Sequence, residues 1–358
     1  MISYHQGNIL HDQADAIINT VNTVGVMGKG LALQFKKAFP ENFKAYKRAC
    51  DDKAVVTGRV LTVSMDSLNP PYYIINFPTK AHWKANSKLE YIELGLKHLK
   101  QEVKRLALTS IAIPPLGSGL GGLNWAEVDQ LIQSAVADMP DVDWRIYPPQ
   151  NAPQAAAMVN NTGRPSMTAG RAAVIGLIEQ YVSTGFVYTL SLLEVQKLVY
   201  FLTAAGEPLN QVTFQKHVYG PYADVLRHVL NRMEGHFISG FADGLNKPDT
   251  PIELEGDAAS EAQNYLAEYT ETKQRFDRVA QLIEGFESQN GMELLSTVHW
   301  VATQEAEDLG SLSIEQIIDK VHEWSPRKAE MKPAHIVAAW QRLSEQGWLQ
   351  LKAPVKAA

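Results

Sequence analysis

Residues 19–35 read NTVNTVGVMGKGLALQF, and they lead from a predicted buried strand through a turn of glycine and polar residues into a predicted helix. Gly25, Gly28 and Gly30 allow the backbone to take positive φ angles and to approach a ligand closely. The helix expected to begin near Leu31 presents unpaired N–H groups, which attract anions. The pattern predicts an α/β sheet with a phosphate-binding turn at the end of this strand.

A second turn of the same kind occurs much later in the chain. Residues 111–125, IAIPPLGSGLGGLNW, again join an apolar strand to a helix, with glycines at Gly117, Gly119, Gly121 and Gly122. A single glycine-rich turn is weak evidence for a ligand, because many such turns are only tight connections. Two of them in one sheet predict a diphosphate that is held from both sides.

Neither turn fits the two best-known phosphate-binding patterns. The chain has no GxxxxGK followed by Ser or Thr, so a P-loop is not indicated. The GxGxxG fingerprint fails as well, because Gly28-Lys29-Gly30 is followed by residues 31–33, LAL, without a third glycine. The sequence therefore favours nucleotide binding over NTP hydrolysis or dinucleotide redox chemistry.

Over the first 150 residues, apolar runs typical of β-strands alternate with segments of helical period. This alternation predicts an α/β layer structure for a first domain, residues 1–150. Amphipathic helices are expected over residues 88–106 and 125–138. The predicted strands are residues 15–22, 59–64, 72–77, 110–114 and 144–147.

Residues 151–168 are rich in Pro, Ala, Asn and Gly and carry little charge, which is typical of a linker. Beyond them the pattern is mostly helical and predicts a second domain, 169–358, with a loop or hairpin near residues 243–257. The predicted helices are residues 172–181, 190–205, 221–233, 261–287, 294–306, 314–323 and 333–345.

Composition limits the class of protein. The 358 residues suffice for two domains, and the single cysteine, Cys50, excludes an internal disulfide and fits a cytoplasmic protein. No uncharged apolar run reaches the roughly 18 residues that span a bilayer, so no membrane role is expected. Residues 1–150 hold 16 Lys+Arg and 14 Asp+Glu, whereas residues 151–358 hold 17 and 25. The acidic second half favours a basic partner or is simply a solvated surface.

A third loop lies between the two glycine turns. In residues 72–88, YYIINFPTKAHWKANSK, a buried strand is expected to end at Phe77-Pro78 and to expose Thr79, Lys80, His82 and Trp83. Functional groups gather at strand ends in open α/β sheets, which makes Lys80 a catalytic candidate, although a lysine at such a position is more often a surface charge. Trp83 is a candidate for stacking on a base. The histidines show no metal-ligand spacing, and neither a metal nor a cofactor is expected.

Taken together, these elements resemble the macrodomain family, whose fold is a three-layer α/β/α sandwich with a mixed sheet that binds ADP-ribose. Residues 6–10, QGNIL, are similar to the family's adenosine-binding element, with Asn8 where many members have aspartate. Asn22 in the first loop would then face the distal ribose, and the second loop would wrap the diphosphate. The resemblance implies an ADP-ribose site of Asn8, Ile9, Thr20, Val21, Asn22, Gly28, Gly30, Leu31, Thr79, Gly117, Ser118, Gly119, Leu120 and Gly121.

Within the macrodomains, MGKGLALQFKKAFP and NFPTKAHWKANSKLEYI resemble the branch of terminal ADP-ribose glycohydrolases and DarG antitoxins, and the whole chain resembles the DarG family. In that branch a lysine matching Lys80 is required for cleavage. The human members also use an aspartate where this chain has Gly121, whereas the DarG type has glycine there. The second domain, through residues 190–209 and 216–230, resembles helical antitoxin domains of the SocA-like type.

This resemblance implies an enzyme that removes ADP-ribose from bases, typically thymidine, of single-stranded DNA. It also implies a DarT-type toxin as partner, bound by residues 169–358, whose acidic surface would occupy the toxin's DNA groove. Lys80 would either attack the distal ribose C1″ as a neutral amine or stabilise the departing base as a cation. Two other classes stay open: a reader that binds ADP-ribose without cleaving it, and a purely stoichiometric toxin inhibitor.

Overall fold

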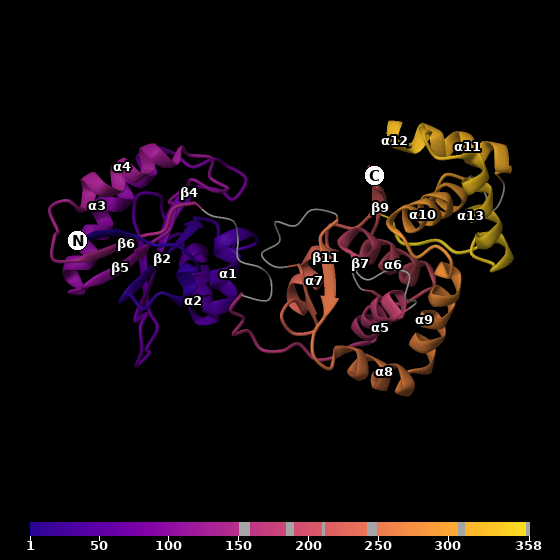
Figure 1. Cartoon of the computed structure of the whole chain (residues 1–358), viewed down its shortest axis with the longest axis horizontal. Helices are drawn as coiled ribbons and strands as arrows, with labels where there is room; N and C mark the ends of the chain where they lie inside the picture. Colours follow the sequence, from indigo (N-terminus) through magenta and orange to yellow (C-terminus); the bar gives the residue numbers. More distant parts are fainter. Residues whose placement is uncertain (150–157, 184–189, 210–211, 242–248, 307–311, 356–358) are drawn as a thin grey trace. The chain divides into compact units, whose positions relative to one another are not determined.

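The computed structural model describes residues 1–149, 158–183, 190–209, 212–241, 249–306 and 312–355 (Figure 1). The described residues form two compact units, one of residues 1–163 and one that begins at Arg164, and each has a hydrophobic core of its own. The first unit is built on a sheet and the second is mostly helical, as the sequence predicts.

The first unit contains a six-stranded mixed sheet in the order β1-β6-β5-β2-β4-β3. Neighbouring strands run parallel except for the edge strand β3, which pairs antiparallel with β4. The strands are β1 (Ile2–Tyr4), β2 (Ala16–Asn22), β3 (Leu61–Ser64), β4 (Tyr73–Lys80), β5 (Ser110–Ile113) and β6 (Asp143–Ile146).

Helices cover both faces of this sheet, because successive side chains of a buried strand point to opposite faces. On β2, Ile18 packs in the core under helices α3 (Leu89–Arg105) and α4 (Trp125–Val136). Its neighbour Ile17 packs with Phe35 of α1 (Gly30–Ala38) on the other side. Helix α2 (Pro40–Asp51) adds Tyr46 to a further cluster with Val21 and Met27. The predicted three-layer α/β/α fold is confirmed.

The five predicted strands and the two amphipathic helices are present, and α1 begins one residue before the expected position. Strand β1 and helix α2 went unassigned in the sequence. The prediction that the third strand ends at Phe77-Pro78 was wrong, because β4 continues to Lys80. The last residue pair between β3 and β4 is Leu61 with Asn76, and Pro78 lies beyond it. The lack of an N–H in Pro78 therefore removes no hydrogen bond between β3 and β4.

Residues 158–163 of the predicted linker pack on the first unit. Val159 contacts the core that contains Phe35. The Asn161 backbone N–H donates to the Lys37 carbonyl at 2.9 Å, and its side-chain amide donates to the Ala38 carbonyl at 2.8 Å. The remaining linker residues up to 157 lie outside the described residues.

The second unit buries helices α5 (Ala169–Ser183) and α6 (Leu192–Ala204) at its centre, and twelve of the thirteen residues of α6 are buried. Small strands and further helices surround this pair. They are β7 (Leu190–Ser191), β8 (Gln215–His217), β9 (Gly220–Tyr222), α7 (Leu226–Met233), β10 (Ile238–Ser239), β11 (Pro251–Leu254), α8 (Ala258–Glu268), α9 (Thr270–Ile283), α10 (Gln289–Gln304), α11 (Ile314–Glu323), α12 (Pro326–Ala329) and α13 (Pro333–Glu345).

Two sequence predictions for this unit were wrong. The helix expected over residues 261–287 is two helices, α8 and α9, which separate at Tyr269. The break lets Leu266 of α8 and Phe276 of α9 both approach Gly176 of α5. The first residues of the helix expected over 221–233 belong to the β8–β9 hairpin, in which Gly220 has a φ angle of +93°. In the loop or hairpin expected near residues 243–257, the described part contains β11, which pairs with β7 and β10.

The core of the second unit contains an unusual set of charges. Lys328 Nζ donates to Glu293 Oε1 at 2.7 Å, and both side chains are buried. Lys197, which is also buried, donates to the Pro221 carbonyl at 2.7 Å. Burial, together with the positive charge of Lys328, lowers the pKa of Lys197 to about 7, against the opposing effect of Glu293.

Replacing Lys197 by methionine is expected to flatten the pH dependence of stability. Between pH 7 and 10.5 the buried amine binds fewer protons in the folded chain than in the unfolded one, so the free energy of unfolding rises with pH by a few kcal/mol. The variant should lose this rise, while Lys352→Met, at an exposed position, should keep it. Thermal unfolding followed between pH 7 and 10.5 checks this; an unchanged rise in the Lys197 variant would contradict it.

Candidate active site

The carboxyl ends of β2 and β4 bring the two residues of greatest interest side by side. In the parallel β2–β4 pair, Val21 is opposite Pro78, and after a register shift Asn22 is opposite Lys80. The loops that follow β1, β2, β4 and β5 leave the sheet at this same edge, because these strands are parallel. Ligands of open α/β sheets bind at such an edge.

The ammonium of Lys80 contacts the second glycine loop. Its Nζ donates to the Leu120 carbonyl at 2.5 Å, across 40 residues of chain. The side chain is partly buried, and this burial lowers the pKa of Lys80 below its ordinary value of 10.5. The lysine is therefore anchored between strand β4 and the predicted diphosphate loop, with an amine that loses its proton more easily than one in water.

Asn22 organises the first glycine loop. Its side-chain amide donates to the Val26 carbonyl at 2.6 Å and accepts from the Val24 and Val26 N–H groups at 3.0 and 3.3 Å. The Tyr46 hydroxyl donates to the Asn22 carbonyl at 2.7 Å. Gly25 fits here with a φ angle of +78°, where a Cβ would lie 2.7 Å from Lys47 Cδ. The amide predicted to face the distal ribose thus fixes the turn beside Lys80.

A buried asparagine network supports this loop from below. Asn19 of β2 donates to Asn76 Oδ1 of β4 at 3.1 Å, and Asn76 donates to Asn42 Oδ1 of α2 at 2.7 Å. Asn19 also lies 3.8 Å from the sulfur of Met27, which is buried under the loop. All three asparagines are fully buried. None of the three was among the predicted site residues. The sequence indicates them only by an asparagine at a position of a strand or helix that is expected to be buried.

The N-terminus of α1 lies directly after the first loop. Gly30 is its first residue and has a φ angle of +58°, and Lys29 before it provides no side-chain cap. The N-terminus of α1 is thus not capped by its N-cap side chain at the position where phosphate binding is predicted. Gly28 is exposed, and the side chain of Leu31 packs partly against the core.

The second loop is folded around glycines with little free space. A Cβ at Gly121 would lie 2.2 Å from the Gly117 carbonyl oxygen and 2.3 Å from Ser87 Oγ. Ser87 is buried, its N–H donates to the Gly121 carbonyl at 3.0 Å, and its Oγ has no hydrogen-bond partner among the described residues. Gly117, with a φ angle of +67°, accepts from the Leu123 N–H at 3.0 Å. Ser87 was not among the predicted site residues.

The remaining residues of this loop differ in exposure. Ser118 is half-buried and Gly119 is exposed, with open space where its Cβ would be. The side chain of Leu120 is 59% exposed next to Lys80. Asn124 caps α4 by accepting from the Ala126 N–H at 2.9 Å, so this helix begins with a cap of its own.

The adenosine-binding element predicted at Asn8 and Ile9 follows β1. Asn8 accepts from the Leu10 N–H at 3.0 Å and so caps the short 3-10 helix Ile9–His11. The Ile9 side chain is part of the core, and Asn8 holds a buried amide N–H that makes no hydrogen bond among the described residues.

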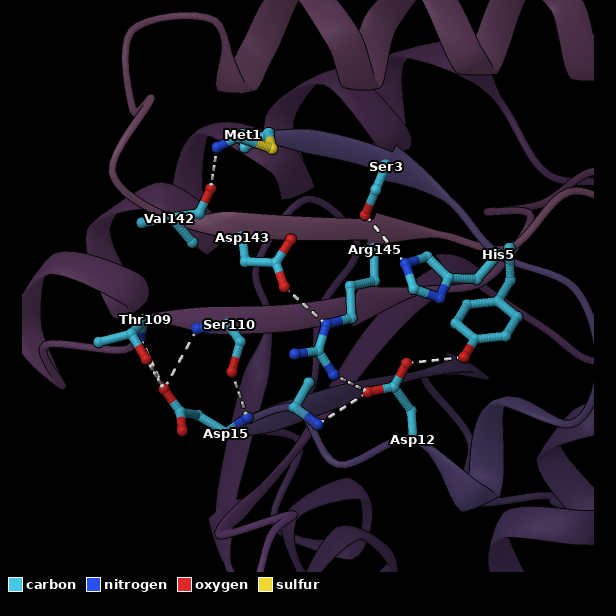
Figure 2. Close-up of polar contacts among 12 residues, drawn as sticks. Met1, Ser3, His5, Asp12, Asp15, Thr109, Ser110, Val142, Asp143 and Arg145 are labelled. Atoms are coloured by element: carbon cyan, nitrogen blue, oxygen red, sulfur yellow. Dashed lines mark hydrogen bonds and ion pairs between the residues drawn. The ribbon is translucent and has the colours of Figure 1, made fainter.

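Ion pairs fix this element to strand β6, as Figure 2 shows. Buried Asp12 accepts from Arg145 Nη1 and from the Tyr147 hydroxyl, both at 2.6 Å, and from the Ala14 N–H at 2.8 Å. Burial and the hydrogen bond to Asp12 raise the pKa of Tyr147. Asp15 similarly accepts from the Thr109 N–H and hydroxyl at 2.7 Å. These contacts fix the segment between Asn8 and β2.

Three predicted site side chains lie away from the open edge. Thr79, which was expected to be exposed, is buried at the irregularity of the β2–β4 register, with its hydroxyl 3.5 Å from the Val21 carbonyl. Val21 packs in the cluster with Met27. Thr20 is half-buried in the middle of β2.

Trp83 lies in the exposed loop after β4 and is 49% exposed. Its ring stacks on that of His82, with centroids 5.5 Å apart, and Lys84 Nζ lies 4.9 Å from its centroid. Within the described ranges, no group of three or more His, Cys, Asp or Glu side chains is arranged to hold a metal ion. In the same part of the chain, no helix is both long and apolar enough to cross a membrane.

Comparison with known proteins shows the family of the chain. The model of the Macro domain family matches residues 18–132. A protein of Thermus aquaticus named DNA ADP-ribosyl glycohydrolase is 43% identical over 98% of this chain and 95% of its own length. The chain belongs to the DNA ADP-ribosyl glycohydrolase family. It is thus a glycosidase-type hydrolase of the DarG kind, and its first unit is a macrodomain.

Two further proteins extend the comparison of this glycohydrolase. The solved macrodomain of Mycobacterium tuberculosis DarG is 51% identical, covers 42% of this chain and 99% of its own, and superposes with a TM-score of 0.42. A DNA ADP-ribosyl transferase–DNA ADP-ribosyl glycohydrolase fusion protein of Thermosipho africanus is 34% identical over 37% of this chain and 38% of its own length.

Proposed function

We propose that this glycohydrolase cleaves the N-glycosidic bond between the distal ribose of ADP-ribose and the base of a thymidine in single-stranded DNA. The observation that carries the proposal is the position of Lys80, beside Asn22 of the first glycine loop and in contact with Leu120 of the second. An ADP-ribose whose diphosphate lies between these loops would bring its distal ribose to the lysine. The name of the Thermus aquaticus relative supports DNA as the carrier.

The proposed reaction uses binding energy from the ADP moiety to orient the distal ribose, which does not itself supply much binding energy. In one route the neutral Lys80 amine attacks C1″, the C1″–N bond breaks, and the base leaves with the electron pair and takes up a proton. Water then hydrolyses the lysyl intermediate. In the other route water attacks C1″, and the Lys80 ammonium stabilises the negative charge of the departing base.

The surroundings of Lys80 bear on both routes. Its partial burial lowers the pKa and so enlarges the neutral fraction that nucleophilic attack requires. A bound diphosphate acts in the opposite direction, since nearby negative charge favours the ammonium. The Leu120 carbonyl accepts a hydrogen bond from either form of the amine, so this contact orients Lys80 in both routes.

Release of free ADP-ribose from an ADP-ribosylated single-stranded oligonucleotide tests the proposal. The full chain should release ADP-ribose and regenerate the unmodified oligonucleotide, as seen by gel shift and mass spectrometry. A protein that binds ADP-ribose but leaves the modified oligonucleotide intact would be a reader, and the proposed hydrolysis would be wrong.

We further propose that the acidic second unit binds and blocks a DarT-type DNA ADP-ribosyl transferase. The supporting observations are the fusion of both activities in the Thermosipho africanus relative and the charge of residues 249–287, which hold ten Asp or Glu and three Lys or Arg. This net charge of −7 accounts for most of the excess acidity of the second half. Asp257, Glu268 and Glu271 are exposed on or beside α8 and α9. A channel that binds single-stranded DNA is basic and attracts such a surface.

Neutralising this surface is expected to weaken toxin binding without affecting hydrolysis. The triple variant Asp257→Asn, Glu268→Gln, Glu271→Gln should lose at least about tenfold in affinity for the toxin, because about 1 kcal/mol is typical of each rim charge pair at low salt. Titration of the full chain against the purified toxin measures this. The matched control Glu41→Gln, Asp52→Asn, Asp141→Asn removes three exposed acids of the first unit. Equal affinities for all three proteins would refute the acidic-surface model.

A further inference from the structure

The exposed loop after β4 forms an arch whose two ends are held beside Lys80. At the start, the Thr23 hydroxyl of the first glycine loop donates to the Ala81 carbonyl at 2.6 Å. At the end, Ser87 is buried and its N–H donates to the Gly121 carbonyl of the second loop at 3.0 Å. Residues 81–86 between these anchors are all exposed. The arch therefore stands at the mouth of the site, connected to both loops predicted to hold ADP-ribose.

The side chains of this arch combine aromatic rings with positive charge. The ring of Trp83 stacks on that of His82, and Lys84 Nζ lies 4.9 Å from the centroid of the Trp83 ring. Lys88 follows the arch, with Nζ 5.5 Å from the ring of Tyr91. No acidic residue occurs between positions 81 and 89. Aromatic faces interleaved with cations are what single-stranded nucleic acid requires, since its bases stack and its phosphates need counter-charges.

ADP-ribose itself does not account for these side chains. Its adenosine element is predicted after β1, and in the sheet β1 is separated from β4 by three strands. Four strand spacings amount to about 19 Å, so the arch lies at the end of the site where the ADP-ribose meets its carrier. The arch then faces whatever continues beyond the distal ribose. In the proposed function this is the DNA strand.

We propose that the arch binds the DNA strand on one side of the modified nucleotide. Trp83 stacks on a neighbouring base, and Lys84 and Lys88 contact phosphates of the same strand. This inference rests on the proposed function, because it assigns the flanking nucleotides of that substrate to a surface. It predicts that the enzyme distinguishes an ADP-ribosylated strand from an ADP-ribosylated nucleoside, although the bond that breaks is the same in both.

The test compares Trp83→Ala and Lys84→Ala/Lys88→Ala with the full chain on two substrates, an ADP-ribosylated oligonucleotide and ADP-ribosylated thymidine. For the oligonucleotide, kcat/KM should fall about tenfold, mainly through KM, because each variant loses either the stacking of one base or the phosphate contacts of the strand. The loss should be at least several-fold smaller for the nucleoside. The lysine variant should also show a weaker dependence of KM on salt. Trp83→Tyr, which keeps a stacking ring, should recover most of the lost activity.

Equal losses on both substrates would overturn the proposal, since the arch would then act on the reacting nucleotide rather than on the strand. Losses on neither substrate would overturn it as well. Lys44→Ala/Lys97→Ala, at exposed helical positions of the same unit, is the matched control for a general loss of positive charge. If the wild-type protein cleaves neither substrate, the proposed function is wrong. Binding of unmodified single-stranded DNA then tests the role of the arch separately. Weaker binding by the variants supports that role, and unchanged binding overturns it.

Discussion

Replacing Lys80 by alanine is expected to reduce the rate of ADP-ribose release from modified DNA on the order of a thousandfold. Such a loss is typical when an enzyme loses its nucleophile or a group that stabilises the charge formed in the transition state. Binding of free ADP-ribose should change little, because the contacts predicted for the diphosphate come from backbone N–H groups of the two glycine loops and of α1. Single-turnover hydrolysis and calorimetric titration with ADP-ribose measure the two effects separately.

Lys80→Arg separates the two routes. Arginine keeps the positive charge but does not supply a neutral amine, so the variant should retain part of the activity if the ammonium only stabilises the leaving base. It should be as inactive as alanine if Lys80 is the nucleophile. In that case the wild-type rate should also rise with pH up to the folded pKa of Lys80, which lies below 10.5 because of burial. Trapping a lysyl–ADP-ribose adduct at position 80 by mass spectrometry would identify the nucleophile directly.

Lys97→Ala is the control for these variants, since Lys97 is an exposed lysine on α3 that pairs with Glu93. It should hydrolyse at the wild-type rate. Hydrolysis by Lys80→Ala within a few-fold of wild type would remove Lys80 from the chemistry. Joint loss of hydrolysis and ADP-ribose binding would instead show that the lysine holds the second loop through its contact with Leu120.

Introducing the acid of the human glycohydrolases, Gly121→Asp, is expected to inactivate this enzyme rather than improve it. Any Cβ at position 121 lies 2.2 Å from the Gly117 carbonyl oxygen, which is backbone and has little freedom to move. Ser87 Oγ, at 2.3 Å, limits the other side. The loop would have to shift, and with it the Leu120 carbonyl that contacts Lys80. We expect a loss of at least tenfold in ADP-ribose affinity and a larger loss in hydrolysis, since overpacking of this kind costs about 1–3 kcal/mol.

Gly121→Ala isolates the steric part of this prediction and should lose affinity to a similar degree, because the clash begins at Cβ. Gly119→Ala is the matched control in the same loop: a Cβ there meets nothing within 4 Å, and the loop should keep its conformation. Titration with ADP-ribose compares the three variants. Wild-type affinity in Gly121→Ala would mean that the loop is not held in this conformation when ADP-ribose binds.

Local patterns accounted for five of the six strands of the first unit, for most of the long helices and for the position of the candidate site. Alternation of apolar residues predicted β2 and its neighbours, and the glycines of residues 25–30 and 117–122 predicted two loops that the structure places at one edge of the sheet. Strand β4 was predicted too short because a proline such as Pro78 usually marks the end of a strand. Whether it does so depends on the neighbouring strand β3, which has already ended at that point.

Other features depend on residues far apart in the chain. Ser87 closes the space at Gly121, and Asn42 of α2 completes the asparagine network of β2 and β4. Nothing local to Ser87 or Asn42 marks either role. The break at Tyr269 likewise follows from the need of Leu266 and Phe276 to reach one glycine of α5, not from a helix-breaking residue.

The sequence by itself determined that two glycine loops follow predicted strands and that a lysine lies near the end of a third, because turns and strand periodicity are properties of short segments. Only the tertiary structure decided that Lys80 lies opposite Asn22 and contacts the Leu120 carbonyl. That placement depends on the strand register with its irregularity at Val21–Asn22 and on packing over 40 residues of chain. Strand register and packing depend on which side chains the whole sheet buries, and this cannot be read from any short segment of the sequence.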